Sequence, residues 1–218
     1  MRRMKLALLV VVGTTFMALA ETRKVDFNQD AADQPPKGFE FGYTAGVGKP
    51  GRWVVQAEGT NKFLAQTDPD STRSRFPVAV LSDVTAADVD LSVRFRPISG
   101  RVDQAAGLVW RYQDQDNYYI VRANALEDNV VLYKVQGGKR TDLPLQGEGR
   151  TYGKKTEVPA SQWSTLRVVV NGGLFEVYFN RSKLYEVEDA TFSQPGKIGV
   201  WTKADSVTQF DDLTVVTK

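Results

Sequence analysis

Arginine and amide side chains gather in the middle of the sequence. Arg122 and Asn124 are two positions apart, so they share one face of any strand that contains them. Guanidinium and amide groups can form paired hydrogen bonds to sugar hydroxyls or to a carboxylate. The alternative is that such residues form cross-strand pairs on a solvated face of a sheet. The sequence predicts a ligand-binding site here, with Arg111, Arg122, Asn124 and Asn129 as its binding residues.

Trp201 and the polar residues after it form a second candidate. An indole ring can stack on the apolar face of a sugar, and Lys203 and Asp205 place a charge of each sign beside it. The alternative is that Trp201 fills the core, as large rings near strand ends often do. We expect Trp201 and Lys203 to complete the ligand-binding set.

Catalysis would have to use a narrow range of side chains. The chain has no histidine and no cysteine, which excludes a Ser-His-Asp triad, thiol chemistry and His-ligated zinc. A glycosidase needs two carboxyl groups roughly 5–10 Å apart across the scissile bond. The sequence shows no such pair flanked by aromatic residues, so it favours binding over turnover. If the protein is an enzyme, Glu127 or Asp205 would be its acid or base.

Adjacent acids near the C-terminus raise the question of a metal. Asp211 and Asp212 could contribute oxygen ligands to a calcium ion. Calcium takes about six to eight oxygens, far more than two neighbouring acids provide. The alternative is a strand end with solvated carboxylates. We therefore expect a structural calcium at most, and no other cofactor.

The first twenty residues indicate export. Arg2, Arg3 and Lys5 precede the apolar run 6–12, and Ala18-Leu19-Ala20 is a small-x-small cleavage pattern. This order is typical of a secretory signal peptide over residues 1–20. A retained N-terminal anchor is the alternative, although the apolar core is shorter than the roughly 20 residues of a spanning helix. The prediction is a periplasmic or extracellular protein with no membrane span after cleavage.

The net charge and the hydrophobic content of the chain bear on which classes of partner it binds. The formal net charge is +2, and three of the basic residues belong to the predicted signal peptide, so the remainder is close to neutral. That balance gives no electrostatic argument for nucleic acid binding. Hydrophobic residues make up 42% of the chain, enough to bury a core without disulfides. We expect a carbohydrate or glycoside ligand.

Apolar and polar residues alternate with a period of two along most of the chain. In the segment 88–96, Val89, Leu91, Val93 and Phe95 share one face. Short segments of this kind recur with turn residues between them, which predicts an all-β, two-sheet antiparallel jelly-roll sandwich. We assign residues 21–37, which contain two prolines, to an extended lead-in and residues 38–218 to one sandwich domain.

The order of several strand motifs resembles that of the concanavalin-A-like lectin/glucanase superfamily, and within it the 3-keto-disaccharide hydrolase-like branch. These motifs are AGLVWR at 106–111, NYYIVR at 117–122, WSTLRV at 163–168, FEVYFN at 175–180, GKIGVWT at 196–202 and FDDL at 210–213. The resemblance implies a jelly roll whose concave face and rim loops often hold a sugar. It also implies a calcium position near Asp211 and Asp212. The acidic motif of family 16 glucanases is not matched, because Glu186-Val187-Glu188-Asp189 has a different spacing.

Three functions remain open from the sequence. The first is an exported, non-catalytic carbohydrate-binding sandwich with a site around Arg111, Arg122 and Asn124 on the concave face and Trp201 at its rim. The second is a hydrolase of the 3-keto-disaccharide type. The third is a structural or protein-binding domain.

Overall fold

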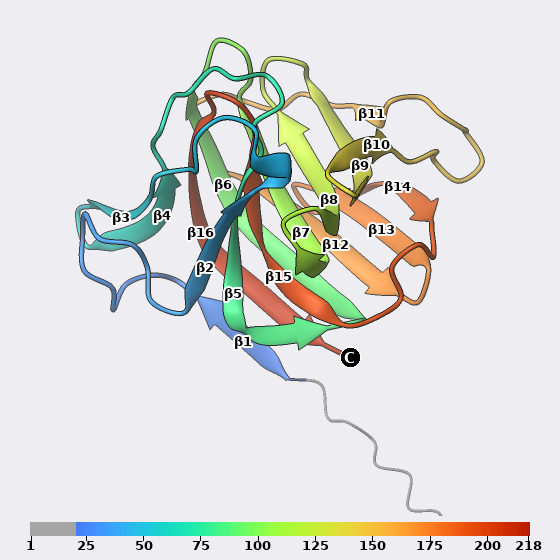
Figure 1. Ribbon diagram of the computed structural model, residues 1–218, viewed down its shortest axis with the longest axis horizontal. Coiled ribbons are helices and arrows are strands. Elements are labelled where there is room, and N and C mark those ends of the chain that lie inside the picture. Colours follow the sequence, from blue (N-terminus) through green and yellow to red (C-terminus); the bar gives the residue numbers. More distant parts are fainter. Residues whose placement is uncertain (1–20) are drawn as a thin grey trace, which may run out of the picture.

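The computed structural model describes residues 21–218, and the predicted signal peptide lies outside the described residues. Two antiparallel sheets face each other, which confirms the all-β sandwich (Figure 1). Sheet A contains, in order, β14 (Ser182–Glu188), β13 (Leu174–Phe179), β12 (Ser164–Asn171), β6 (Val89–Ser99), β16 (Val207–Thr217), β4 (Asn61–Gln66) and β3 (Trp53–Glu58), with β1 (Thr22–Val25) beside β16. Sheet B contains β10 (Lys139–Asp142), β9 (Asn129–Gln136), β8 (Asn117–Asn124), β7 (Ala105–Asp114), β15 (Gly196–Thr202), β5 (Pro77–Ala86) and β2 (Phe39–Tyr43), with β11 (Lys154–Lys155) beside β9. Between β2 and β3 lies the one-turn 3₁₀ helix η1 (Thr44–Gly46).

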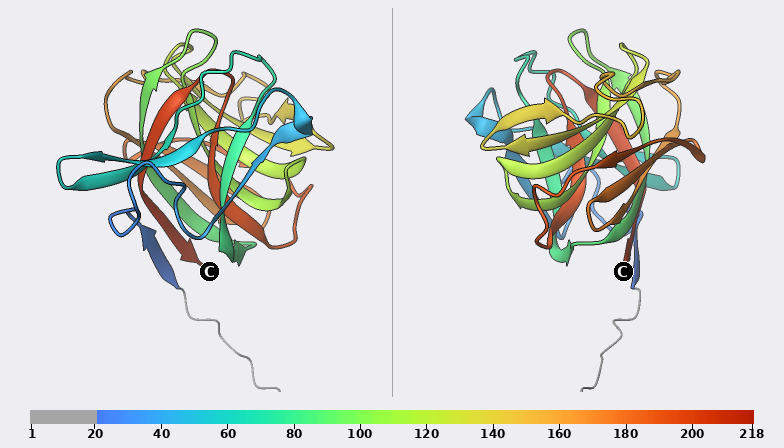
Figure 2. Two further views of the ribbon diagram at one scale, coloured as in Figure 1. Left: turned by 60° about the vertical axis from the view of Figure 1, so that its left-hand side comes forward. Right: turned by 90° about the vertical axis from the view of Figure 1, so that its right-hand side faces the viewer.

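Strands distant in sequence are neighbours in both sheets, as a jelly roll requires. β16 lies between β6 and β4, and β15 lies between β7 and β5, so the C-terminal strands sit at the centre of the two layers (Figure 2). β1, which belongs to the expected lead-in, pairs with β16 from Thr22 opposite Val216 to Val25 opposite Leu213. In residues 21–218 no helix has the length and apolarity needed to cross a membrane.

The main core fills the space between the sheets. β6 follows the predicted alternation, with Val89, Leu91, Val93 and Phe95 buried and the intervening residues half-exposed. From the other side, residues of sheet B such as Val121 complete the same cluster. Sheet A therefore has one buried face and one solvated face.

Sheet B is buried on both faces. Along β8, Tyr119 and Val121 point into the main core, whereas Tyr118, Ile120 and Arg122 point away from sheet A and are also fully buried. The outer residues form a second apolar cluster made of Phe76, Val78, Val80, Ala105, Val109, Tyr118, Ile120, Val131, Tyr133, Val135 and Trp201. A covering segment must therefore lie over this outer face.

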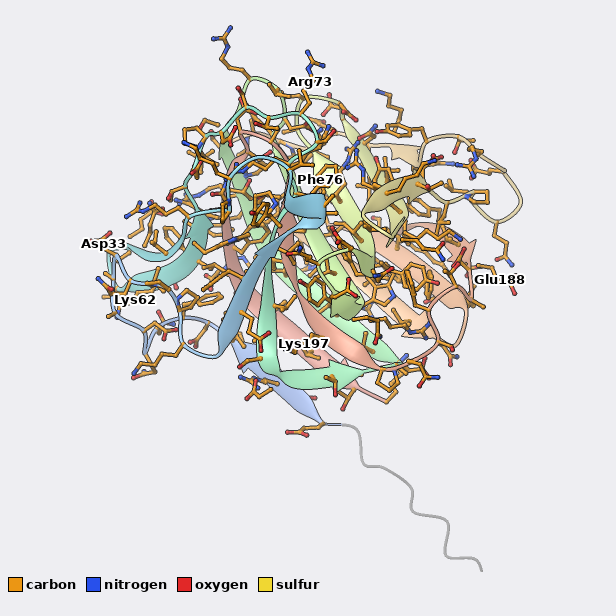
Figure 3. The ribbon with its side chains drawn as sticks, viewed as in Figure 1. Asp33, Lys62, Arg73, Phe76, Glu188 and Lys197 are labelled. Carbon is orange, nitrogen blue, oxygen red and sulfur yellow. The ribbon has the colours of Figure 1, made fainter. Side chains whose placement is uncertain are left out.

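The segment between β4 and β5 provides that cover. Its last residue, Phe76, lies beside η1 (Figure 3). Phe76 stacks on Trp201 with ring centres 5.3 Å apart, and its carbonyl accepts the N–H of Thr44 in η1. Arg75 is fully buried beside it and donates to the carbonyls of Lys49 (2.6 Å) and Ala204 (2.7 Å). One guanidinium thus ties three loops together over sheet B.

Candidate functional site

A polar cluster centred on Arg122 occupies one end of the outer face of sheet B. The Arg122 guanidinium donates to Glu127 Oε2 and to Asn129 Oδ1, both at 2.5 Å, and to the Tyr133 hydroxyl at 3.2 Å. The Tyr152 hydroxyl lies 3.4 Å from the same guanidinium. We call these five residues the Arg122 cluster. The buried cation is held by a carboxylate, an amide and two phenols.

Local structure explains why these groups meet. β8 and β9 form a hairpin in which Asn124 lies opposite Asn129 and Arg122 opposite Val131. The turn between them carries Glu127, and Asp128 adopts a left-handed conformation with φ 48°. Alternation then places Arg122, Asn129 and Tyr133 on the same outer face.

Gly153 brings the fifth member into place. Its φ is 72°, and a Cβ there would stand 2.2 Å from the Val130 carbonyl oxygen. Only glycine permits so close an approach between the loop 146–153 and β9. The Tyr152 ring consequently packs edge-on against Tyr133, with centres 6.0 Å apart, while 44% of Tyr152 stays exposed.

Glu127 remains ionised in this setting. Burial alone would raise its pKa, but the Arg122 charge, the Arg122 hydrogen bond and the Asn129 amide together hold the pKa of Glu127 below its usual value. For Tyr133 burial dominates and raises the pKa of the phenol, although the nearby Arg122 and Arg140 act in the opposite direction. The cluster therefore presents one fixed carboxylate beside the neutral Tyr133 phenol.

An open cleft of about 430 Å³ lies against the cluster. Glu127 and Asn129 form part of its wall, and Tyr152, Leu126 and Lys155 surround its mouth. Leu126 is 49% exposed, so an apolar side chain and an aromatic ring are both accessible beside the polar wall. Such a mixture can hold the apolar face of a ring while hydrogen-bonding its polar edge.

Asn124, Lys203 and Asp205 form a separate network. The Asn124 amide donates to Asp103 Oδ1 at 2.6 Å, and Lys203 forms an ion pair with the other oxygen of Asp103. Asp205 accepts the backbone N–H groups of residues 101, 102 and 103 at 2.7 to 3.1 Å. Asn124 is fully buried and Asp205 nearly so. These residues fix the loop before β7 against the loop after β15, and they do not line the cleft.

The pKa of Asp205 reflects that role. Burial raises it, but the backbone hydrogen bonds outweigh burial and hold the pKa of Asp205 below its usual value. A carboxylate already accepting three backbone donors is poorly placed to exchange protons with a substrate.

Trp201 does not lie at the rim of a binding site. Its ring is fully buried between the sheet and Phe76, and its indole N–H donates to the Tyr118 hydroxyl at 3.2 Å. The expectation of an exposed stacking ring is wrong, because the segment before β5 covers the end of β15 where Trp201 lies. The alternative reading, that the ring fills a core, is the observed one.

Arg111 does not join the Arg122 cluster. It sits at an irregularity of β7 with φ 47°, and its guanidinium donates to the carbonyls of Ala87 (2.8 Å), Phe192 (2.6 Å) and Gly172 (2.7 Å). It also packs over Phe175 in the main core. The expected grouping of Arg111 with Arg122 and Asn124 in one site is therefore not found, because the irregularity turns Arg111 towards the loops at the other end of the sheets.

Asp211 and Asp212 are neutralised by basic side chains. Asp212 forms ion pairs with Lys24 (2.9 Å) and Arg94 (3.1 Å), and Asp211 accepts the Asn61 amide at 3.0 Å. Burial raises the pKa of Asp212, yet Lys24 and Arg94 bring it below its usual value. Residues 21–218 contain no group of three acidic, histidine or cysteine side chains placed to hold a metal.

Tyr133, Tyr152 and Lys155 belong to the site although the sequence did not single them out. Tyr133 shares its strand face with Asn129, so the parity that groups Arg122 with Asn124 also includes it. Tyr152 is the aromatic residue of the glycine-rich stretch 147–153. An aromatic side chain between glycines is the signal by which the sequence could have indicated it.

Comparison with known proteins identifies the fold. No family model matches the sequence, and no curated protein matches it. Among solved structures, the carbohydrate-binding module CBM66 from Bacillus subtilis is similar over 83% of this chain and 96% of its own, with a TM-score of 0.61 and 20% identity. Domain 4 of AbnA, a GH43 extracellular arabinanase from Geobacillus stearothermophilus solved with arabinotriose, is similar over 91% of this chain and 93% of its own (TM-score 0.57, 14% identity). The Emp46p carbohydrate recognition domain in its metal-free form is similar over 88% of this chain and 94% of its own (TM-score 0.55, 13% identity).

These similarities define the class of the domain. The chain has a concanavalin-A-like, lectin-type β-sandwich fold. At such low identity the likeness concerns the fold, and function must be argued from the site.

Proposed function

We propose that the protein is an exported, non-catalytic carbohydrate-binding domain whose sugar site is the cleft beside the Arg122 cluster. The observation that carries the proposal is the exposed Tyr152 ring next to a polar wall held rigid by the buried Arg122 guanidinium. A sugar ring presents an apolar face and a polar edge, and the cleft offers a partner for each. The similar structures include a carbohydrate-binding module and an arabinanase domain solved with arabinotriose, which supports this choice of ligand.

Binding suits the site better than hydrolysis. The pKa of Glu127 lies below its usual value because of the Arg122 charge and hydrogen bonds, so its carboxylate can accept hydrogen bonds from sugar hydroxyls but is a poor proton donor. Asp205, the other acid considered, is enclosed by backbone N–H groups and lies outside the lining of the cleft. Glycoside hydrolysis of the usual kind needs two carboxyl groups facing one bond.

The test is a binding screen of the protein against an oligosaccharide panel, followed by calorimetry. Tyr152→Ala removes the exposed ring and should weaken binding by about tenfold or more, because a stacked aromatic residue contributes about 1–3 kcal/mol at comparable sites. Phe41→Ala is the matched control, since Phe41 is 42% exposed but lies in the middle of β2, the strand at the edge of sheet B opposite β9 and β10. Product analysis should find intact sugar.

Other outcomes would count against the proposal. Equal losses in the two variants would place the site elsewhere. Turnover abolished by Glu127→Gln would make the protein a hydrolase of the alternative kind. Failure of the whole panel would favour a structural or protein-binding role.

Export has its own test. Expression of the full chain in a Gram-negative host should release a periplasmic protein whose first residue is Glu21, as the Ala18-Leu19-Ala20 pattern predicts. Recovery of an uncleaved chain in the membrane fraction would support the retained anchor instead.

A further inference from the structure

Lys155 brings to the cleft a positive charge that no acid in residues 21–218 neutralises. Its ammonium group donates to the Glu127 carbonyl at 2.8 Å, and none of the ion pairs in this part of the chain includes it. The preceding residue behaves differently. Lys154 is bound by both oxygens of Glu148, at 2.7 and 2.9 Å, and it does not line the cleft. Neighbouring residues of β11 thus offer one free ammonium group and one neutralised group.

Two acids near the site already have a cation: Glu127 is neutralised by Arg122 at 2.5 Å, and Asp103 by Lys203. Asp128, in the same turn as Glu127, accepts the backbone N–H of Val158 at 3.0 Å and forms no ion pair within residues 21–218. None of these carboxylates binds the Lys155 ammonium group, which is therefore available to a ligand. A polar group from a ligand is the natural partner for the ammonium protons that the Glu127 carbonyl does not use.

Arg140 adds a second surplus cation behind the cluster. Its guanidinium stacks on Tyr133 at 4.3 Å and on Phe76 at 4.7 Å, and within residues 21–218 it takes part in no ion pair. Its Nη1 atom is buried without a hydrogen-bond partner there. Arg140 and Arg122 share the Tyr133 ring, so two guanidinium groups lie close together at this end of sheet B.

We propose that the cleft takes an anionic saccharide, one whose ring carries a carboxylate or sulfate group, and that Lys155 is the residue that selects the charge. The inference rests on the proposed function. The sugar ring stacks on Tyr152, its hydroxyls bond to Glu127 and Asn129, and its anionic group pairs with Lys155. Lysine is a compact point charge without the fixed fork of arginine, which suits either anion.

Calorimetry on matched ligands tests this. Oligogalacturonate and its methyl ester share one backbone and differ in charge, as do a sulfated galactan oligosaccharide and its desulfated form; the two pairs separate carboxylate from sulfate as the source. We expect the acidic member of at least one pair to bind about tenfold more tightly at low salt, and the difference to shrink as salt is added.

The two adjacent lysines provide the decisive variants. Lys155→Gln should weaken binding of the acidic ligand by about tenfold and so remove most of the difference between the acidic and the neutral ligand, whereas Lys154→Gln should leave that difference intact. Both residues are accessible, and thermal unfolding of each variant verifies that it folds.

Three results would overturn the inference. The first is that neutral ligands bind as tightly as acidic ones. The second is that Lys155→Gln and Lys154→Gln change the affinity for the acidic ligand equally. In both cases binding that still depends on Tyr152 would leave the proposed function standing. If neither member of any pair binds, and no other sugar of the panel does, the proposed function fails together with the inference.

Discussion

The outer faces of the two sheets differ in how far their charged side chains are exposed to water. On sheet A the residues that point outward are half-exposed and form ion pairs in water, as Arg167 does with Asp90 at 2.6 and 2.7 Å. On sheet B many outward residues are buried: the segment that ends in Phe76 covers Trp201, and Arg122 is fully buried among Asn129, Tyr133 and the loop that carries Tyr152.

The difference lies in solvation. A charge on the outer face of sheet A keeps much of its hydration, so its pairing contributes little to stability. A charge on the outer face of sheet B has lost its hydration and is stable only when every donor finds a partner. Such a network is rigid, and rigidity is what a binding cleft requires.

The largest difference is expected between two tryptophans. Trp201→Ala should lower the free energy of unfolding by about 4 kcal/mol, because it empties a fully buried site between Phe76 and sheet B. Trp163 lies on the outer side of sheet A, half-buried against Arg94 and Arg96 at 4.9 and 4.8 Å. Trp163→Ala should cost about 1 kcal/mol. Urea unfolding measures both, and equal losses would mean that the cover over sheet B opens readily.

The second-largest difference in stability is expected between two arginines, one on the outer face of each sheet. Arg122→Met should destabilise the protein by about 3 kcal/mol, since it leaves Glu127 and Asn129 without their buried partner. Arg167→Met removes an ion pair of similar geometry on sheet A and should cost less than about 1 kcal/mol. Similar losses in equilibrium unfolding would show that burial does not set the difference between the faces.

The smallest expected effect concerns the stability of the protein at acid pH. Asp205 has a folded-state pKa below its usual value of 3.8, so its contribution is complete above that pH and is lost as the pH falls through the lowered value. Asp205→Asn should cost about 2 kcal/mol at pH 7 and make the loss of stability below about pH 4 shallower.

Added salt should distinguish the Asp205 carboxylate from that of Glu176 on sheet A. Glu176 also has a lowered pKa, chiefly through its hydrogen bond to the exposed Lys183. Its contribution should disappear in about 0.5 M salt, whereas that of Asp205 should persist because backbone N–H groups supply it. Unfolding curves of Asp205→Asn and Glu176→Gln against pH, in low and high salt, test this. A loss of the Asp205 effect in salt would contradict the assignment.

The sequence by itself determined the strands and the class of fold. β6 and β13 alternate as their apolar residues predict, and β13 begins and ends where its pattern does. Such features depend on residues one or two positions apart, and local periodicity reports them directly. The pairing of Arg122 with Glu127 and Asn129 was within reach for the same reason, because one hairpin holds all three.

Only the tertiary structure decided which polar residues share a site. A buried run such as β8 does not reveal what covers its outer face, and here a segment more than forty residues earlier in the chain does so. That cover encloses Trp201, while an irregularity in β7 turns Arg111 away from the Arg122 cluster. The loop that ends at Gly153 brings Tyr152 and Lys155 to the cleft. These contacts join distant parts of the chain, and the free energy that selects them comes from burial in three dimensions, which local sequence patterns do not encode.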